Sequence, residues 1–225
     1  MTFSEQLKAT IADLHLLSHP FYQAWTRGEL SQQELQHYAA QYQPFVEAFP
    51  RYVSGLHSRC DNAEARTMIL ENLMDEEGTT GRSAPHPQLW QDFMDGLGSH
   101  KAQQFGQAAL AARDTYLDVC RSSYEGGLCA LYAYEYQTPE ISKTKIEGLK
   151  SFYGIETPEA LAFFKVHETA DVYHSATCEK LIDAIPADRQ VEALMAARKA
   201  AQTLWDFLSE VHGDKGCAMA ESTAA

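Results

Sequence analysis

The stretch His167-Glu168-Thr169-Ala170-Asp171-Val172-Tyr173-His174 is the one around which the rest of this sequence can be organised. It lies inside a segment with the pattern of a long helix, and an α-helix turns by ~100° per residue, so His167, Asp171 and His174 share one face. Two imidazoles and a carboxylate suit iron, manganese or zinc, and converging carboxylates from other helices would favour a redox metal. The plainer interpretation is a surface helix with a polar face. A zincin motif is excluded, because Asp171 stands where its second histidine is required.

Composition limits the class of protein. The chain has 225 residues, 45% of them apolar and 22% charged, which is ordinary for a globular protein with a substantial core. Its net charge of -13 argues against nucleic-acid and anionic-membrane partners. Five cysteines without a C-x-x-C spacing suit a reducing compartment. Residues 1–8 lack the order of a signal peptide, and no apolar run approaches ~18 residues, so the sequence predicts a cytoplasmic protein.

Apolar residues recur at helical spacing through most of the chain, with caps and prolines at the starts of segments. The residues predicted to pack inward include the aromatic row Tyr38, Tyr42, Phe45, Phe49 and Tyr52, then Leu89, Trp90, Phe93 and Met94, and in the last helix Val191, Leu194, Met195, Ala201, Leu204, Trp205 and Leu208. We expect Pro44 and Pro50 to bend or divide their helix, and Pro139 to kink a long helix at 124–154. The other predicted helices cover 4–17, a short piece at 21–27, a segment opened by the capping box Ser31-Gln32-Gln33-Glu34, one from Asp61 through Leu73, one from His86, 101–121, one from Thr157 and one from Pro186. The prediction is an all-α bundle of about seven helices, with one domain at 1–212 and a disordered tail at 213–225.

Three residues outside the 167–174 stretch are further candidate ligands. Glu76 and His86 stand at two helix ends on either side of a loop, where they can complete a metal site; a solvated loop is the plainer interpretation. Glu135 stands among aromatic and aliphatic residues, so it must be paired, metal-bound or protonated. The assembled set would form a non-haem dimetal oxygenase site with open positions for dioxygen. Its six members are Glu76, His86, Glu135, His167, Asp171 and His174.

Seven ordered segments carry a resemblance to a known family. They are Phe21-Tyr22-x-x-Trp25, Ala48-Phe49-Pro50-Arg51-Tyr52, His57-Ser58-Arg59-Cys60-Asp61, Asn72-Leu73-Met74-Asp75-Glu76-Glu77, His86-x-x-Leu89-Trp90, Tyr132-x-Tyr134-Glu135-x-Gln137-x-Pro139 and His167-Glu168-x-Ala170-Asp171-Val172-x-His174. They closely resemble the family of the Chlamydia protein associating with death domains (CADD). That family belongs to the haem-oxygenase-like dimetal oxidases, which are related in fold to the coenzyme PQQ synthesis protein C and the thiaminase-like TenA proteins.

The resemblance implies a haem-oxygenase-like fold without haem and a di-iron or iron-manganese centre that uses dioxygen and an external reductant. It also implies production of 4-aminobenzoate for folate by a self-sacrificing reaction. In this chain the matching ring source is Tyr22 and the matching amino donor is Lys145, with Lys143 as the alternative two residues away. Tyr134 is implied as a relay for an electron or a radical. Metal-activated dioxygen can oxidise a nearby phenol, and a lysine in a dry pocket keeps a neutral, nucleophilic amine. Without the resemblance, an ordinary packed tyrosine and a solvated lysine are the plainer interpretations.

Two features depart from the family pattern. The loop at 78–85 is longer than in the relative, and the tail has only Cys217 instead of a cysteine-rich ending. Nothing in the sequence supports death-domain binding.

Three other functions stay open. They are a multiple-turnover dimetal oxygenase with an external small-molecule substrate, a TenA-like hydrolase that uses Cys129 as nucleophile, and a non-enzymatic interaction protein with a vestigial metal site. The sequence leaves open the metal in each position, the reductant and the oligomeric state, with a homodimer as one option. The partners expected from the chemistry are small molecules.

Overall fold

The computed structural model describes residues 1–213, apart from the side chains of Ala170 and Tyr173. Helices account for most of these residues and none of them forms a strand, so the prediction of an all-α protein is confirmed. The helices are α1 (Phe3–Thr10), α2 (Pro20–Thr26), α3 (Gln32–Arg59), α4 (Ala63–Glu76), α5 (His86–Leu97), α6 (Gln107–Ser122), α7 (Tyr124–Glu135), α8 (Thr138–Phe152), α9 (Pro158–Asp183) and α10 (Ala187–Gly213), with 3-10 turns at Ala12–Leu14 and Leu16–Ser18. The part of the predicted tail beyond Gly213 lies outside the described residues.

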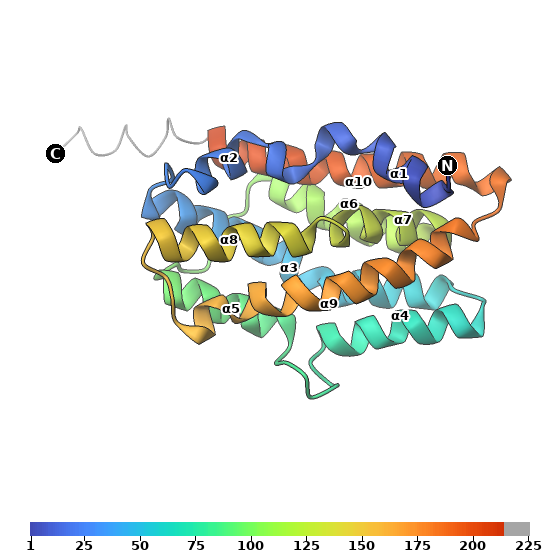
Figure 1. Cartoon of the computed structure of the whole chain (residues 1–225), viewed down its shortest axis with the longest axis horizontal. Helices are drawn as coiled ribbons and strands as arrows, with labels where there is room; N and C mark the ends of the chain where they lie inside the picture. The colour runs from blue at the N-terminus through green and yellow to red at the C-terminus, as the bar shows by residue number, and fades with distance from the viewer. Residues whose placement is uncertain (214–225) are drawn as a thin grey trace.

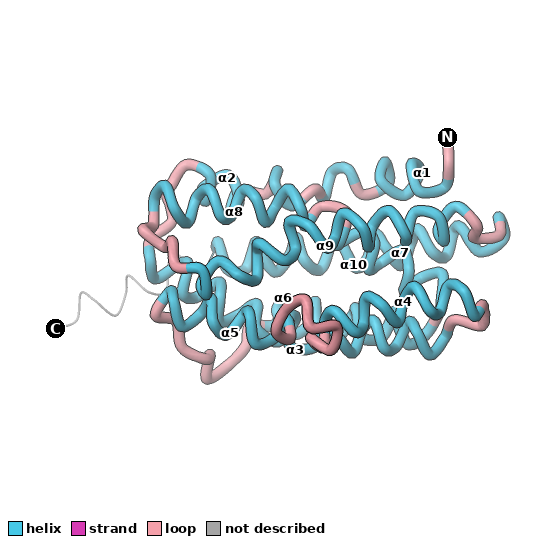
Figure 2. Tube along the Cα trace, turned by 60° about the horizontal axis from the view of Figure 1, so that its bottom comes forward, coloured by secondary structure: helices cyan, strands magenta, loops and turns pink. Residues whose placement is uncertain are grey.

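The long helices run side by side along the long axis of the molecule (Figure 1). Helix α9 packs against α5, α7 and α8, and α10 packs against α6 and α7. Helices α4 and α5 follow one another along a single edge, so the loop between them projects from the middle of the bundle and not from an end (Figures 1 and 2). The last residue of α4 and the first residue of α5 therefore lie near the middle of α9.

Several helix starts follow the predicted cap chemistry. Ser31 and Glu34 form a complete capping box at the start of α3. Thr157 caps α9 by accepting a hydrogen bond from the backbone N–H of Ala160, and Pro158 occupies the first turn. Helix α5 begins at His86, as predicted.

Other boundaries were predicted wrongly because a local cap elsewhere is better. Helix α1 begins after a capping box of Thr2 and Glu5 and ends at Thr10, so the predicted helix over 4–17 is too long. Asn62, and not Asp61, caps α4 through its side-chain oxygen. Helix α6 begins at Gln107, and not at 101, because the backbone before it is extended at Gly106, whose N–H donates to Gln41 at 2.7 Å.

Proline acted differently from the prediction in two helices. Helix α3 stays one helix through Pro44 and Pro50, both of which are buried, so of the two predicted outcomes, bending or division, division is excluded. Burial of most of one helix outweighs a proline cost of about 3 kcal/mol. The predicted helix over 124–154 is interrupted before Pro139, which lies in the first turn of α8, where its missing N–H costs no hydrogen bond. This interruption follows directly after Glu135.

The core is rich in aromatic side chains. The row on α3 that was predicted to pack inward, Tyr38, Tyr42, Phe45, Phe49 and Tyr52, is buried along its whole length, as are Leu89, Trp90, Phe93 and Met94 of α5. The inner face of α10 was partly mispredicted. Val191 and Met195 are 66% and 68% exposed, because Ala193, Ala197 and Ala200 form the face that packs closely on the bundle.

No helix within residues 1–213 is both long enough and apolar enough to cross a membrane.

Close packing of α8 on α2 gives a first prediction. A Cβ on Gly148 would lie 2.6 Å from Nε1 of Trp25, a fully buried side chain. We expect Gly148→Ala to be destabilising, because overpacking of about 1–3 kcal/mol outweighs a gain in helix propensity of about 1 kcal/mol. Chemical denaturation measures the change. Gly213→Ala is the control, since a Cβ there meets nothing within 4 Å among residues 1–213. Equal stability of the two variants would contradict the prediction.

Candidate metal centre

Three predicted ligands from three helices meet at the middle of the bundle. Glu76 ends α4 and His86 begins α5, and Oε2 of Glu76 lies 3.0 Å from Nδ1 of His86. The ring of His86 contacts the ring of His167 on α9 edge to face, with 4.5 Å between centroids. One ligand atom from each of the three residues lies within 4.8 Å of the other two, and all three residues are buried. This geometry matches a metal triad.

The orientation of His167 is set by its own helix. Its Nδ1 lies 2.7 Å from the carbonyl oxygen of Phe163, and because a carbonyl can only accept, Nδ1 carries the proton. Nε2 is therefore the atom available to a metal, in the tautomer that metal-binding histidines usually have.

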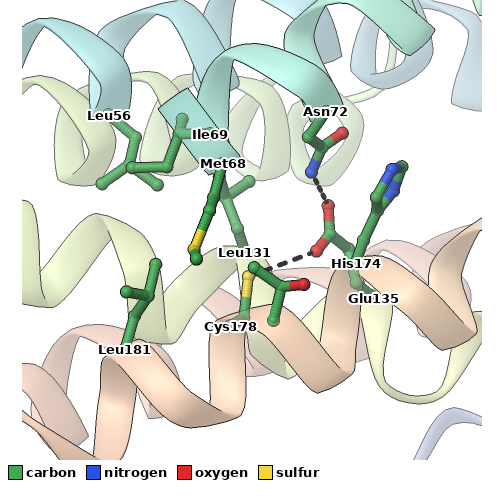
Figure 3. A pocket seen from close by; sticks show the side chains of 10 residues that line it. Leu56, Met68, Ile69, Asn72, Leu131, Glu135, His174, Cys178 and Leu181 are labelled. Atoms are coloured by element: carbon green, nitrogen blue, oxygen red, sulfur yellow. Dashed lines mark hydrogen bonds between the residues drawn. The ribbon is translucent and has the colours of Figure 1, made fainter. Parts of the chain in front are cut away.

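The other three predicted ligands lie beside this triad. Nδ1 of His174 is 3.6 Å from Oδ1 of Asp171, one turn earlier on α9. Glu135, the last residue of α7, accepts a hydrogen bond from Nδ2 of Asn72 at 2.8 Å and a weak one from Sγ of Cys178 at 3.9 Å (Figure 3). Glu135 also interacts electrostatically with both Asp171 and His174.

Burial and mutual charge shift the pKa values of these groups. Burial, and next the charge of Asp171, raise the pKa of Glu135 to about 7. For Glu76 burial acts to raise the pKa, but the neighbouring imidazole of His86 outweighs it and the pKa is lowered. For His174 burial acts to lower the pKa, but the carboxylate of Asp171 beside it, and then those of Glu135 and Glu76, raise it to about 9. The interior therefore favours positive charge among these carboxylates.

A metal cation fits this environment. Nε2 of His86 and Oδ2 of Asp171 are buried polar atoms without a hydrogen-bond partner in the described part of the chain. Such orphaned atoms are costly unless something else satisfies them. Imidazole nitrogens and carboxylate oxygens together suit iron and manganese as well as zinc. The donor set and the orphaned atoms agree with the metal use predicted from the sequence.

The residue Asp75 was not predicted, although it contacts a candidate ligand. Its Oδ2 accepts a hydrogen bond from Nε2 of His174 at 3.3 Å. Its Oδ1 accepts one from Thr80 at 2.8 Å and pairs with Arg82 at 2.9 Å, so the loop after α4 holds the carboxylate in place. A carboxylate behind a metal-binding histidine orients the ring and raises its basicity. The only signal in the sequence was an acid directly before Glu76.

Lys145 lies in an aromatic pocket between α2, α3 and α8. Its Nζ donates a hydrogen bond to the hydroxyl of Tyr38 at 2.6 Å and lies 5.4 Å from the ring centroid of Tyr22. Lys145 is 4% exposed, and burial lowers the pKa of its ammonium group to about 7. Lys143, the alternative donor, is exposed. The two lysines are thus clearly different in environment.

A row of tyrosines leads from this pocket toward Glu135. The rings of Tyr38 and Tyr42 stack with 5.6 Å between centroids, and the hydroxyl of Tyr42 donates to that of Tyr134 at 3.1 Å. Tyr134 directly precedes Glu135 in the chain. Core packing was the prediction for Tyr38 and Tyr42, and their spacing on α3 could not show which polar groups they meet.

Cys129 does not have the environment of a nucleophile. The side chain is fully buried, and burial raises the pKa of its thiol to about 12. A nucleophilic cysteine needs a lowered pKa, so the TenA-like hydrolase mechanism through this residue is not supported.

Known proteins resemble this chain along most of its length. The sequence is 41% identical over 213 residues to a 4-aminobenzoate synthase of Chlamydia muridarum, covering 92% of this chain and 89% of the relative. It is 39% identical over 229 residues to a 4-aminobenzoate synthase of Nitrosomonas europaea, covering 94% and 91%. The structure of a CADD-like protein of unknown function from Nostoc punctiforme superposes with a TM-score of 0.77 at 18% identity, covering 94% and 96%, which shows a shared fold.

Residues 36–206 match the haem-oxygenase-like family described as iron-containing redox enzymes. The resemblance inferred from the seven segments is therefore confirmed. With a family match over this range and relatives near 40% identity, the chain belongs to the haem-oxygenase-like iron-containing redox enzymes.

Proposed function

We propose that this protein makes 4-aminobenzoate from its own side chains at a dimetal centre, with dioxygen and an external reductant as small-molecule partners. The observation that carries the proposal is the buried Lys145 amine, 5.4 Å from the ring centroid of Tyr22 and linked by tyrosines to the candidate metal centre. The relatives named 4-aminobenzoate synthase support the product.

The proposed ligands divide into two groups. Glu76, His86 and His167 would hold one ion, as their converging ligand atoms suggest. Asp171, His174 and Glu135 would hold the second. Bound iron, or iron with manganese, would supply activation of dioxygen and one-electron oxidation.

The connectivity of tyrosine matches that of the product. In tyrosine the methylene and the hydroxyl are para to each other, as are the carboxylate and the amino group in 4-aminobenzoate. Tyr22 would thus provide the ring and the carboxylate carbon: its Cα–Cβ bond would break, and dioxygen would oxidise Cβ to the carboxylate. Nitrogen would replace the phenol oxygen, which would leave as water, and the Cε–Nζ bond of the donor lysine would break. Lys145 would provide this nitrogen as a neutral amine, which its desolvation favours. Its burial beside the ring supports it over the exposed Lys143.

Tyr134 and its neighbours would carry oxidising equivalents from the centre to the pocket. Burial raises the pKa of Tyr42 and Tyr134 well above the ordinary value, so both phenols stay protonated. The hydrogen bond between their hydroxyls allows a proton to move when an electron does. The proposed path continues through Tyr38, whose hydroxyl contacts the Lys145 amine.

The ring source is tested by mass spectrometry. When reduced protein loaded with iron and manganese meets dioxygen, we expect side-chain mass to be lost at Tyr22 and 4-aminobenzoate to be released. Tyr22→Phe should release none, because the phenol to be oxidised is gone. Tyr52→Phe is the control, since the Tyr52 hydroxyl is buried and has no hydrogen-bond partner among the residues that the structure describes. An intact Tyr22 after many turnovers would instead support an oxygenase with an external substrate.

If Lys145 is the amino donor, the rate of 4-aminobenzoate release should depend on pH. Because the pKa of Lys145 is lowered to about 7, the neutral fraction of its amine falls about tenfold from pH 8 to pH 6. The initial rate of 4-aminobenzoate release should fall with it, in protein that is loaded with metal at pH 8 and then shifted. Lys145→Met should release no product, whereas Lys143→Arg should behave like wild type. Loss of product in the Lys143 variant alone would reassign the donor.

We expect the carboxylate of Asp75 to strengthen metal binding through His174. Asp75→Asn replaces the carboxylate behind His174 with an amide and should weaken metal affinity about 10–100-fold. Titration with Mn²⁺, followed by electron paramagnetic resonance, measures this without any turnover. Asp95→Asn on the exposed face of α5 is the matched control. Equal affinities in the two variants would show that Asp75 does not position His174.

A further inference from the structure

A small cavity between α3, α4, α7 and α9 reaches two of the proposed ligands, Glu135 and His174 (Figure 3). Its volume is about 20 Å³, which is enough for one molecule of the size of water. Glu135 and His174 line its inner end, so a molecule in the cavity touches two proposed ligands. Leu56, Ile69 and Leu131 are among its apolar lining residues.

The same cavity comes close to the surface. A groove of about 420 Å³ lies outside it, lined in part by Tyr124, Lys180 and Pro186. Met68 of α4 and Leu181 of α9 line both the groove and the cavity. Both side chains are half-buried, and methionine has a flexible, unbranched side chain. Movement of Met68 would therefore join the groove to the cavity.

The lining of the cavity selects by polarity. Its apolar lining residues are Leu56, Met68, Ile69, Leu131 and Leu181, and its polar ones are Asn72, Glu135, His174, Thr177 and Cys178. Asn72 and Cys178 already donate hydrogen bonds to Glu135. A solute that enters from the groove passes Met68 and Leu181, where a charged or strongly polar molecule would lose its hydration at a cost. A different hollow of about 310 Å³ reaches His86 and His174, and it is lined by Asp75, Arg82, Ser83 and Thr169. Polar solutes have that second approach, so the apolar cavity is left for an uncharged, apolar molecule.

We propose that the apolar cavity is the entry path and transient binding site of dioxygen, with Met68 and Leu181 as its gate. The proposal rests on the proposed function, because it requires a centre that reacts with dioxygen. Met68 and Leu181 are not among the proposed ligands, and in this proposal they control access to the centre. Dioxygen would arrive beside Glu135 and His174, away from the aromatic pocket of Lys145.

Variants of the gate test the path by kinetics. In reduced, metal-loaded protein, Met68→Trp should lower the second-order rate constant for dioxygen at least tenfold, because the indole fills the junction between groove and cavity. Met68→Ala should not lower it. Met74→Trp is the matched control, since the same change is then made six residues later on α4, at an exposed side chain that lines neither space. An unchanged rate constant in Met68→Trp would overturn the proposal.

Xenon tests the cavity without turnover. Metal-free crystals under xenon pressure should show a bound atom beside Leu56, Ile69 and Leu131, and the absence of this atom would overturn the binding site. The two proposals also fail differently. Slower dioxygen consumption in Met68→Trp, without any 4-aminobenzoate from wild type, would retain the path and reject the product. Release of 4-aminobenzoate at an unchanged rate in Met68→Trp would retain the product and reject the path.

Discussion

Burial of three carboxylates among three imidazoles is the constraint on which the rest of this structure depends. Isolated carboxylates inside a bundle are too costly, and Glu76, Glu135 and Asp171 are all buried. Each is made tolerable by a neighbour: His86 beside Glu76, Asn72 beside Glu135, and His174 beside Asp171. Burial, and next the charge of Asp171, raise the pKa of Glu135 to about 7, and two metal cations would offset both effects. The end of α4 and the start of α5 meet in the middle of the bundle and bring Glu76 and His86 into this cluster (Figure 1).

Burial in the same interior raises the pKa of Glu135 but lowers the pKa of Lys145, because it disfavours the charged form of each group. Without a carboxylate partner among its described contacts, the ammonium group is destabilised by burial, and its pKa falls to about 7. Aromatic rings surround it, and Tyr38 accepts its hydrogen bond. The interior of the bundle therefore holds a cluster of carboxylates and imidazoles that favours a bound cation and, apart from it, a neutral amine. The hydroxyls and rings of Tyr38, Tyr42 and Tyr134 connect the two. In the proposed reaction this separation keeps the nucleophile apart from the metals until the ring of Tyr22 has been oxidised.

Prediction from sequence succeeded where the information was local or periodic. Helical spacing placed His167, Asp171 and His174 on one face, and cap chemistry placed the starts of α3, α5 and α9. It failed where packing chose between similar signals. Val191 and Met195 looked like core residues, but alanines allow closer contact between helices. Pro44 and Pro50 looked like interruptions, but burial of α3 outweighed them. The family resemblance, not periodicity, led to Tyr22 and Lys145.

By itself, the sequence determined an all-α protein, most helix positions and the six candidate ligands, because helix periodicity, caps and buried charge are properties of short segments. Only the tertiary structure decided that Glu76, His86 and His167 converge, that Asp75 stands behind His174, and that Lys145 is buried while Lys143 is exposed. The same holds for the cavity behind Met68. These features depend on which faces of distant helices meet, and desolvation by those faces then sets the chemistry of each group.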